Sequence, residues 1–248
     1  MFNFGSFNFP ELRRVASTTF VLISFQYIHG IFTQLAFYSH QPTSLLRDRG
    51  FELLPELGAQ NQWVSEMMFG ISFSLFIIWL LVNWHIEAYV KWVRLLCICQ
   101  LLRIITFSVT LLPSPNYHCR KENFIAPELP SNPFVYFVVN IGRQTTRSCG
   151  DLIFSSHTIF ILSFAIIYSR YGIHNYMKLL AWLWACVTSI LIIASRKHYT
   201  VDVIVAWYVV PLVNAFLYNI DMSALSTRTQ KKHCKNRSVQ FDKIDRLV

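Results

Sequence analysis

The chain has 248 residues, of which 54% are hydrophobic and only 14% are charged, so it is far more apolar than an average soluble domain. Several apolar runs reach about 18 residues or more, which is enough to cross a ~30 Å hydrocarbon core as a helix. The net charge of +9 lies largely beyond Ile220, away from any aromatic-rich surface that would bind nucleic acid. The composition therefore excludes a soluble globular class, argues against a nucleic-acid partner and predicts a polytopic membrane protein.

Six membrane-spanning helices are predicted, so the expected fold is an all-α bundle of six transmembrane helices. The first apolar run is too long for a signal peptide and lacks a small-residue cleavage site, which indicates a retained span. Trp63 and Trp84 bracket the second run as interfacial anchors do. In chain order, the predicted spans cover residues 15–38, 63–84, 92–112, 152–168, 179–194 and 200–220.

These spans divide the chain into a cytosolic N-terminus (residues 1–14), a six-span membrane domain (15–220) and a basic, disordered cytosolic tail (221–248). An even number of spans places both termini on one face of the membrane. Lys and Arg residues favour that face, chiefly because of the tail, so the positive-inside rule places both termini in the cytosol. The opposite face is then lumenal or exoplasmic.

Polar side chains gather where the predicted spans meet this non-cytosolic face. Asp151 and His157 stand at the start of the fourth span, and His198 and Asp202 stand at the start of the sixth. In HYTVDV a spacing of four places His198 and Asp202 on one face of a helix, where the carboxylate would fix the imidazole tautomer. Each residue alone is more often structural, but two histidines and an aspartate at one membrane face supply a nucleophile, its orienting group and a general acid–base.

The segment CGDLIFSSHT, from Cys149 to Thr158, and the segment HYTVDV resemble the two signature motifs of the sphingomyelin synthase family, a branch of the lipid phosphate phosphatase superfamily. Residues 103–115 (RIITFSVTLLPSP) and, more weakly, residues 47–57 (RDRGFELLPEL) are similar to two further motifs of that family. The similarity covers roughly residues 45–220, in the same order. It implies that a phosphocholine head group passes from phosphatidylcholine to the primary hydroxyl of ceramide, giving sphingomyelin and diacylglycerol.

The resemblance implies that His198 is the nucleophile of a phospho-histidine intermediate, that Asp202 orients it, and that His157 acts as acid and then as base. It implies no cofactor and no metal. Phosphatidylethanolamine as donor, water as acceptor, and a catalytically silent lipid-binding relative remain alternatives. The expected partners are the membrane of the Golgi or the plasma membrane and the lipid substrates, and a homo-oligomer stays open. Ser156 stands where the family usually has glycine, which permits closer backbone approach and bears on how well the pocket admits phosphate.

Further residues are candidates for substrate binding. Arg103 lies in the third span, where a charge is costly, and it either holds phosphate or pairs with a carboxylate. Asp151 either orients His157, binds the head group or caps a helix. A disulfide between Cys119 and Cys149, in the long non-cytosolic loop, is the other open question. The substrate-binding candidates are Arg103, Asp151, Ser155, Ser156 and Tyr199.

Overall fold

The structure is a computed structural model that describes residues 9–125, 132 and 149–244. Within these ranges the chain forms helices and irregular segments, and it contains no strand. Two compact units can be distinguished, Met1–Val210 and Pro211–Val248. The predicted all-α class is confirmed for this part of the chain.

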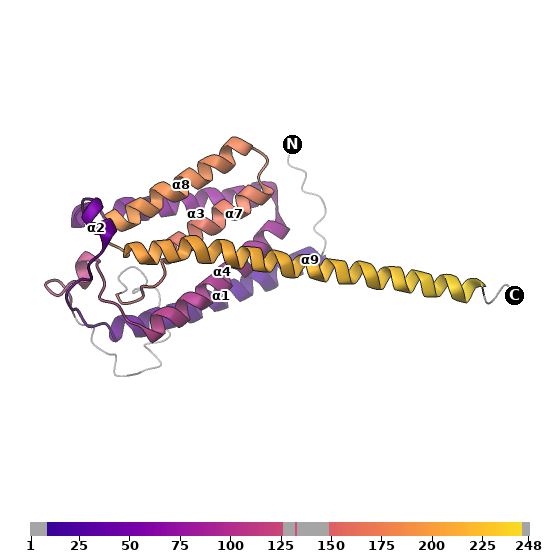
Figure 1. Cartoon of the computed structure of the whole chain (residues 1–248), viewed down its shortest axis with the longest axis horizontal. Helices are drawn as coiled ribbons and strands as arrows, with labels where there is room; N and C mark the ends of the chain where they lie inside the picture. Colours follow the sequence, from indigo (N-terminus) through magenta and orange to yellow (C-terminus); the bar gives the residue numbers. More distant parts are fainter. Residues whose placement is uncertain (1–8, 126–131, 133–148, 245–248) are drawn as a thin grey trace. The chain divides into compact units, whose positions relative to one another are not determined.

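The first unit is built from long helices joined by short turns and by longer segments at one end (Figure 1). Short helical turns precede α3 and follow α4 in these segments. The long helices are α1 (Phe9–Tyr38), α3 (Trp63–Asn83), α4 (Ile86–Val109), α7 (Ser156–Tyr171), α8 (Asn175–Ala194) and the beginning of α9 (Thr200–Ile244), and the short ones are α2 (Arg49–Leu53), η1 (Ala59–Asn61) and η2 (Tyr117–Cys119).

Five of these helices are long and apolar enough to cross a membrane, namely α1, α3, α4, α8 and α9. The fourth predicted span corresponds to α7, which has 16 residues and is about 24 Å long at 1.5 Å per residue. We expected this span to begin at Leu152, but the helix begins only at Ser156, because the Ser155 hydroxyl caps it by accepting a hydrogen bond from Thr158 N. The apolar residues before Ser155 are irregular chain.

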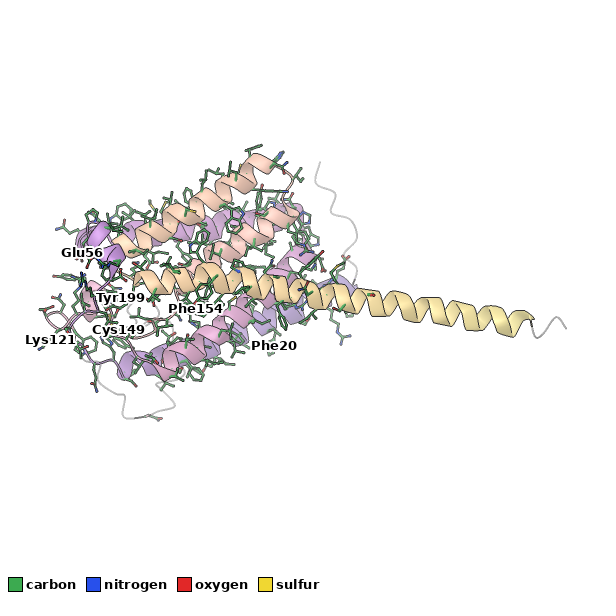
Figure 2. All side chains as sticks on the ribbon, viewed as in Figure 1. Phe20, Glu56, Lys121, Cys149, Phe154 and Tyr199 are labelled. Carbon is green, nitrogen blue, oxygen red and sulfur yellow. A yellow bond between two sulfur atoms is a disulfide. The ribbon has the colours of Figure 1, made fainter. Side chains whose placement is uncertain are left out.

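Helix α7 lies at the centre of the first unit. It packs against α3, α4 and α8, and α4 in turn packs against α1. The α3–α7 contact contains the stacked rings of Phe76 and Phe164, whose centroids are 4.4 Å apart, and Trp92 Nε1 of α4 donates to Ser163 Oγ of α7 at 2.9 Å. Outward-facing apolar side chains such as Phe20 of α1 are exposed (Figure 2). An apolar outer surface is the one that lipid chains would cover.

Helix α9 continues without a break from Thr200 to Ile244, which differs from the disorder predicted for residues 221–248. The reason lies in the composition, since the chain after Pro211 contains no further proline and no glycine. Lys, Arg, Gln, Leu and Ala, which have good helix propensity, recur there.

Candidate active site

The connecting segments that carry the polar residues meet at one end of the first unit (Figure 1). Backbone and side-chain hydrogen bonds join segments that are distant in sequence: Ser155 N donates to Asp202 O at 3.1 Å, and Thr200 N donates to Asp48 Oδ2 at 2.7 Å. Figure 2 shows Cys149 and Tyr199 at this end. The convergence that span parity predicted is therefore present in the structure.

His198 and Asp202 form a buried pair, with 6% and 0% of their surfaces exposed. His198 Nδ1 lies 3.2 Å from Asp202 Oδ2. A carboxylate oxygen only accepts, so Nδ1 carries the proton in this contact and Nε2 keeps a free lone pair. Asp202 also accepts from Tyr199 N at 3.0 Å and from Ile153 N at 3.1 Å. It therefore fixes the tautomer of His198 and ties the segment before α7 to α9.

The geometry of this pair differs from the predicted helix face, because His198 precedes the start of α9 at Thr200. Asp202 lies in the first turn of the helix and its carboxylate points back toward the residues before the helix. The spacing of four brings the two side chains together across the helix start instead of along one turn.

His157 is the second residue of α7 and comes close to His198, with ring centroids 6.2 Å apart. Its Nε2 lies 3.4 Å from Glu66 Oε2 of α3, and Glu66 also forms an ion pair with Lys197. The edge of the ring meets Phe69, at a centroid distance of 5.0 Å. His157 is thus positioned from α3. The two imidazoles meet edge to face, one from α7 and the other from the segment just before α9.

A cavity of about 300 Å³ lies beside both histidines. Among the predicted residues, Asp151, Ser156, His157 and His198 line it. Glu66 and Lys197 add charged groups, and α1 and α4 add further polar side chains. A volume of this size is at the lower end of what small-molecule sites have, and both imidazoles border it.

Arg103 lies behind the cavity wall and is only 1% exposed. Its Nη2 pairs with Asp151 Oδ2 at 2.8 Å, its Nε donates to Phe154 O at 2.7 Å, and its Nη1 donates to His29 Nε2 at 2.7 Å. The sequence left two roles open for Arg103, binding phosphate or pairing with a carboxylate, and in the structure it pairs with a carboxylate. Arg103 therefore holds the segment that leads into His157.

Two other predicted substrate-binding residues also support the walls. Ser155 caps α7 through Thr158 N. The Tyr199 hydroxyl donates to Pro113 O at 2.7 Å and accepts from Leu46 N at 3.2 Å, and its ring stacks on Phe51 at 5.4 Å. Neither residue is among those that line the cavity. Tyr199 instead joins the segments that follow α1 and α4.

Burial and ion pairs shift the pKa values of two groups that line the cavity, Asp151 and Lys197. Burial raises the pKa of Asp151, but the Arg103 guanidinium, together with His198 and His29, lowers it by more in total, so that it lies below its ordinary value. Burial lowers the pKa of the Lys197 ammonium, and the hydrogen bond to Glu66 opposes this shift only in part. The Asp151 carboxylate is therefore held ionised by Arg103, whereas Lys197 is held next to the carboxylate that orients His157.

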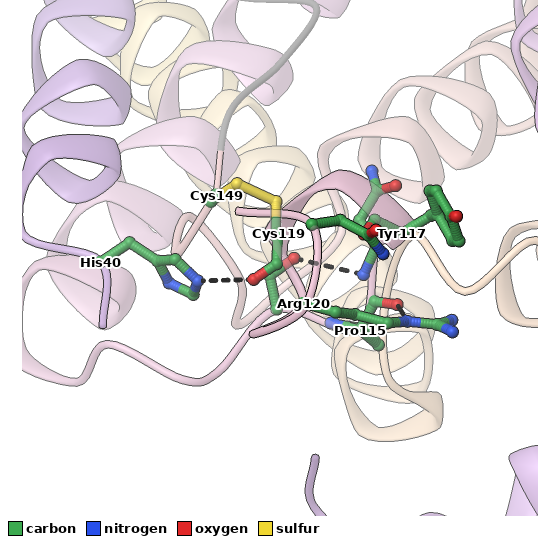
Figure 3. The surroundings of a disulfide bond; sticks show 9 residues. His40, Pro115, Tyr117, Cys119, Arg120 and Cys149 are labelled. Carbon is green, nitrogen blue, oxygen red and sulfur yellow. Dashed lines mark hydrogen bonds between the residues drawn. A yellow bond between two sulfur atoms is a disulfide. The ribbon is translucent and has the colours of Figure 1, made fainter. Parts of the chain in front are cut away.

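Cys119 and Cys149 form a disulfide, with Cα atoms 5.8 Å apart (Figure 3). It joins the segment after α4 to the segment before α7. His40 Nε2, from the end of α1, lies 3.2 Å from Cys119 O, as Figure 3 also shows. The bridge thereby fixes the chain that enters the site, and the question that the sequence left open is answered by this pairing.

The predictions from sequence missed Glu66, although it contacts both His157 and Lys197. A signal existed, since Glu66 is a carboxylate a few residues inside the predicted second span, at the non-cytosolic face. Thr33 and Gln100, which also line the cavity, carried no comparable signal, because single neutral polar residues in spans commonly hydrogen-bond between helices.

Comparison with known proteins agrees with this arrangement. Residues 148–220 match the family model described as PAP2 superfamily C-terminal. The chain is 47% identical over 207 residues to a phosphatidylinositol:ceramide inositolphosphotransferase of Oryza sativa subsp. indica, covering 79% of this chain and 63% of the relative. It is 47% identical over 201 residues to phosphatidylinositol:ceramide inositolphosphotransferase 3 of Arabidopsis thaliana, covering 76% and 68%.

A more distant relative is phosphatidylcholine:ceramide cholinephosphotransferase 1 of Gallus gallus, 29% identical over 138 residues, with 53% of this chain and 33% of the relative covered. The chain spans about 63% of the length of the rice relative. The Arabidopsis match covers more than two thirds of that protein at high identity, and the matched family model contains both histidines. The chain belongs to the sphingomyelin synthase family of the PAP2 superfamily.

Proposed function

We propose that this protein is a phosphotransferase that moves a phospho-head group from a glycerophospholipid to the primary hydroxyl of ceramide. The observation that carries the proposal is the pair of imidazoles at one cavity, 6.2 Å apart between ring centroids, one of them backed by the buried Asp202. A nucleophile with its orienting carboxylate, facing a second acid–base group, is the set that a two-step displacement at phosphorus needs.

In the first step His198 Nε2 attacks the phosphorus of the donor, the N–P bond forms and the bond from phosphorus to the diacylglycerol oxygen breaks. His157 gives its proton to that oxygen. In the second step the ceramide hydroxyl attacks the phospho-histidine, His157 takes the hydroxyl proton and the N–P bond breaks. Asp202 stabilises the imidazolium character of His198 in each step, as a buried carboxylate does for a catalytic imidazole.

Inositol phosphate is the head group that we propose. The motifs in the sequence imply phosphocholine, with phosphoethanolamine as an alternative, whereas the relatives point to inositol. Both plant relatives described above are inositolphosphotransferases at 47% identity, whereas the chicken cholinephosphotransferase is 29% identical and matches about half of this chain. The higher identity over a longer match favours phosphatidylinositol as donor, with phosphatidylcholine as the second candidate.

We further propose that the site faces the lumenal or exoplasmic side of a secretory membrane, such as the Golgi or the plasma membrane, with both termini in the cytosol. The disulfide between Cys119 and Cys149 lies at the same end as the two histidines, and disulfides persist in oxidising compartments. The basic residues beyond Ile220 support the cytosolic placement of the tail.

The test is a lipid transfer assay with membranes that contain the full chain. Labelled ceramide is supplied with phosphatidylinositol, phosphatidylcholine or phosphatidylethanolamine, and the lipid products are resolved. We expect a phosphoinositol ceramide with the wild type and none with His198→Ala. The matched control is His174→Ala, since His174 is exposed and precedes α8 at the opposite end of the unit, and it should keep full activity.

Each alternative predicts a different result. Release of a water-soluble inositol phosphate without a ceramide product would indicate a phosphohydrolase. A phosphocholine ceramide as the main product would show that phosphatidylcholine, and not phosphatidylinositol, is the donor. A folded protein that turns over none of the three donors would refute the transferase and leave a lipid-binding relative.

A further inference from the structure

The cavity is also lined by polar side chains for which the transfer chemistry has no use. Thr33 comes from α1, Gln100 from α4 and Asn116 from the segment after α4, and all three line the cavity. Thr33 and Gln100 are 5% and 1% exposed. Thr33 Oγ1, Gln100 Oε1 and Asn116 Oδ1 are buried and lack a hydrogen-bond partner among the described residues.

Buried polar atoms without a partner are costly, and native structures contain few of them. Three such atoms at the wall of one cavity therefore indicate a ligand, or the water that it displaces, with groups that donate hydrogen bonds. Aromatic side chains also border the cavity: they are Phe69 of α3 and Phe160 of α7, and Phe69 contacts His157. Polar and apolar lining thus meet at the catalytic histidines.

A lipid that reacts at phosphorus places its head group on one side of the reacting atom and its acyl chains on the other. The aromatic lining suits the acyl part. The polar lining must then contact the head group, and its hydrogen-bonding groups can determine which head group binds. A quaternary ammonium has no N–H group to donate and is recognised by aromatic faces. A primary ammonium donates but cannot accept from the Thr33 hydroxyl. A ring hydroxyl both donates and accepts.

We propose that Thr33, Gln100 and Asn116 form a head-group subsite that takes a polyhydroxyl ring through hydrogen bonds and discriminates against cationic head groups. This inference rests on the proposed function for the identity of the bound lipid, and it assigns donor choice to residues of α1, α4 and the segment after α4. These residues lie outside both histidine motifs.

The experiment measures binding and turnover separately. Dioctanoyl phosphatidylinositol and dioctanoyl phosphatidylcholine are titrated into the purified full chain carrying His198→Ala, so that no donor is consumed. Thr33→Val and Gln100→Leu remove the polar atoms at nearly constant volume, and Thr33→Ser keeps the hydroxyl. The matched control is Gln34→Leu, because Gln34 is equally buried and its amide is also without a partner in the described part of the chain, but it does not line the cavity.

We expect the combined Thr33→Val and Gln100→Leu variant to bind phosphatidylinositol about tenfold more weakly, the loss expected for one to two net hydrogen bonds. Thr33→Ser and Gln34→Leu should bind it as the parent does, and binding of phosphatidylcholine should not weaken. In the His198-containing protein, the combined variant should lower kcat/KM for phosphatidylinositol relative to phosphatidylcholine by a similar factor. Thermal unfolding verifies that each variant is folded.

Unchanged phosphatidylinositol affinity in the combined variant would overturn the subsite, as would an equal loss in Gln34→Leu or an equal loss for both lipids. The subsite and the proposed function can fail separately. If ceramide is converted but these substitutions have no effect, only the subsite proposal is refuted. Selective binding of phosphatidylinositol that depends on Thr33 and Gln100, without any ceramide product, supports the subsite and removes the transferase.

Discussion

Replacing Arg103 with methionine separates a structural role from a phosphate-binding role for the buried cation of α4. Methionine fills a similar length without charge, and it would leave the Asp151 carboxylate, whose side chain is 16% exposed, without its cation. The contacts to Phe154 O and His29 would be lost as well. Breaking a buried ion pair by removing one partner costs about 3–5 kcal/mol. We therefore expect the free energy of unfolding to fall by about that amount.

The assay is reversible denaturation of the detergent-solubilised full chain, combined with the donor KM from the transfer assay. The second variant is Arg103→Met with Asp151→Asn, which removes both charges. Because the cost of the single change is mainly the unpaired carboxylate, the double variant should recover a large part of the lost stability. Arg103→Lys keeps the charge but loses the planar fork that reaches acceptors on three residues, and its stability should lie between those of the wild type and Arg103→Met.

The contrary outcome is specific. If Arg103→Met changes the unfolding free energy by less than about 1 kcal/mol, a value typical of exposed pairs, and raises the donor KM instead, then Arg103 binds phosphate. A double variant that is no more stable than the single one would show that the hydrogen bonds to the backbone dominate over the ion pair.

Three further changes test the site. Asp202→Asn should reduce kcat roughly 10³- to 10⁴-fold, as loss of an orienting carboxylate does in catalytic triads, and steady-state rates with retained folding measure it. Glu66→Gln should lower kcat about 10- to 100-fold by loosening the acid–base group, with little change in donor KM. The control Glu87→Gln, in the first turn of α4, should change neither. Replacing Cys119 and Cys149 by serine removes a cross-link with a sequence separation of 30. Because the unfolded chain gains entropy, the free energy of unfolding should fall by roughly 3–4 kcal/mol. Thermal unfolding under oxidising conditions measures this loss, and an unchanged Tm would count against the bridge.

The predicted residues that the structure brings close together share one property, which is that their relation follows from local spacing or from span parity. His198 and Asp202 are four residues apart, so any conformation near a helix start brings them close. His157 could be added because an even number of crossings between two segments returns the chain to the same face. The apolar runs thus define both the helices and the end of the bundle at which the polar residues meet.

The remaining features depend on distances that periodicity does not encode. An apolar stretch gives no indication of whether it is helical, so the start of α7 at Ser156 could not be separated from the irregular residues before it. The charge of Arg103 required a partner, but only the structure identifies Asp151. Glu66 and Gln100 are single polar residues in different spans, and their common cavity arises from the packing of α1, α3, α4 and α7 around one point.

On the proposed function, the charges around the cavity would favour transfer over tight binding of the donor. A phosphodiester is an anion, yet the nearby cations already have partners: Arg103 pairs with Asp151 and Lys197 pairs with Glu66. What remains for the phosphate is the N-terminus of α7, where backbone N–H groups and the helix dipole favour an anion, and the two imidazoles. In the proposed first step, positive charge develops on His198 as the N–P bond forms, while His157 gives up its proton to the leaving oxygen. Interactions that strengthen in the transition state raise kcat, whereas equal binding of ground state and transition state does not. On the proposed function, the pairing of Lys197 and Arg103 with carboxylates would therefore leave the charge that develops on His198 as the main electrostatic stabilisation of the reacting group.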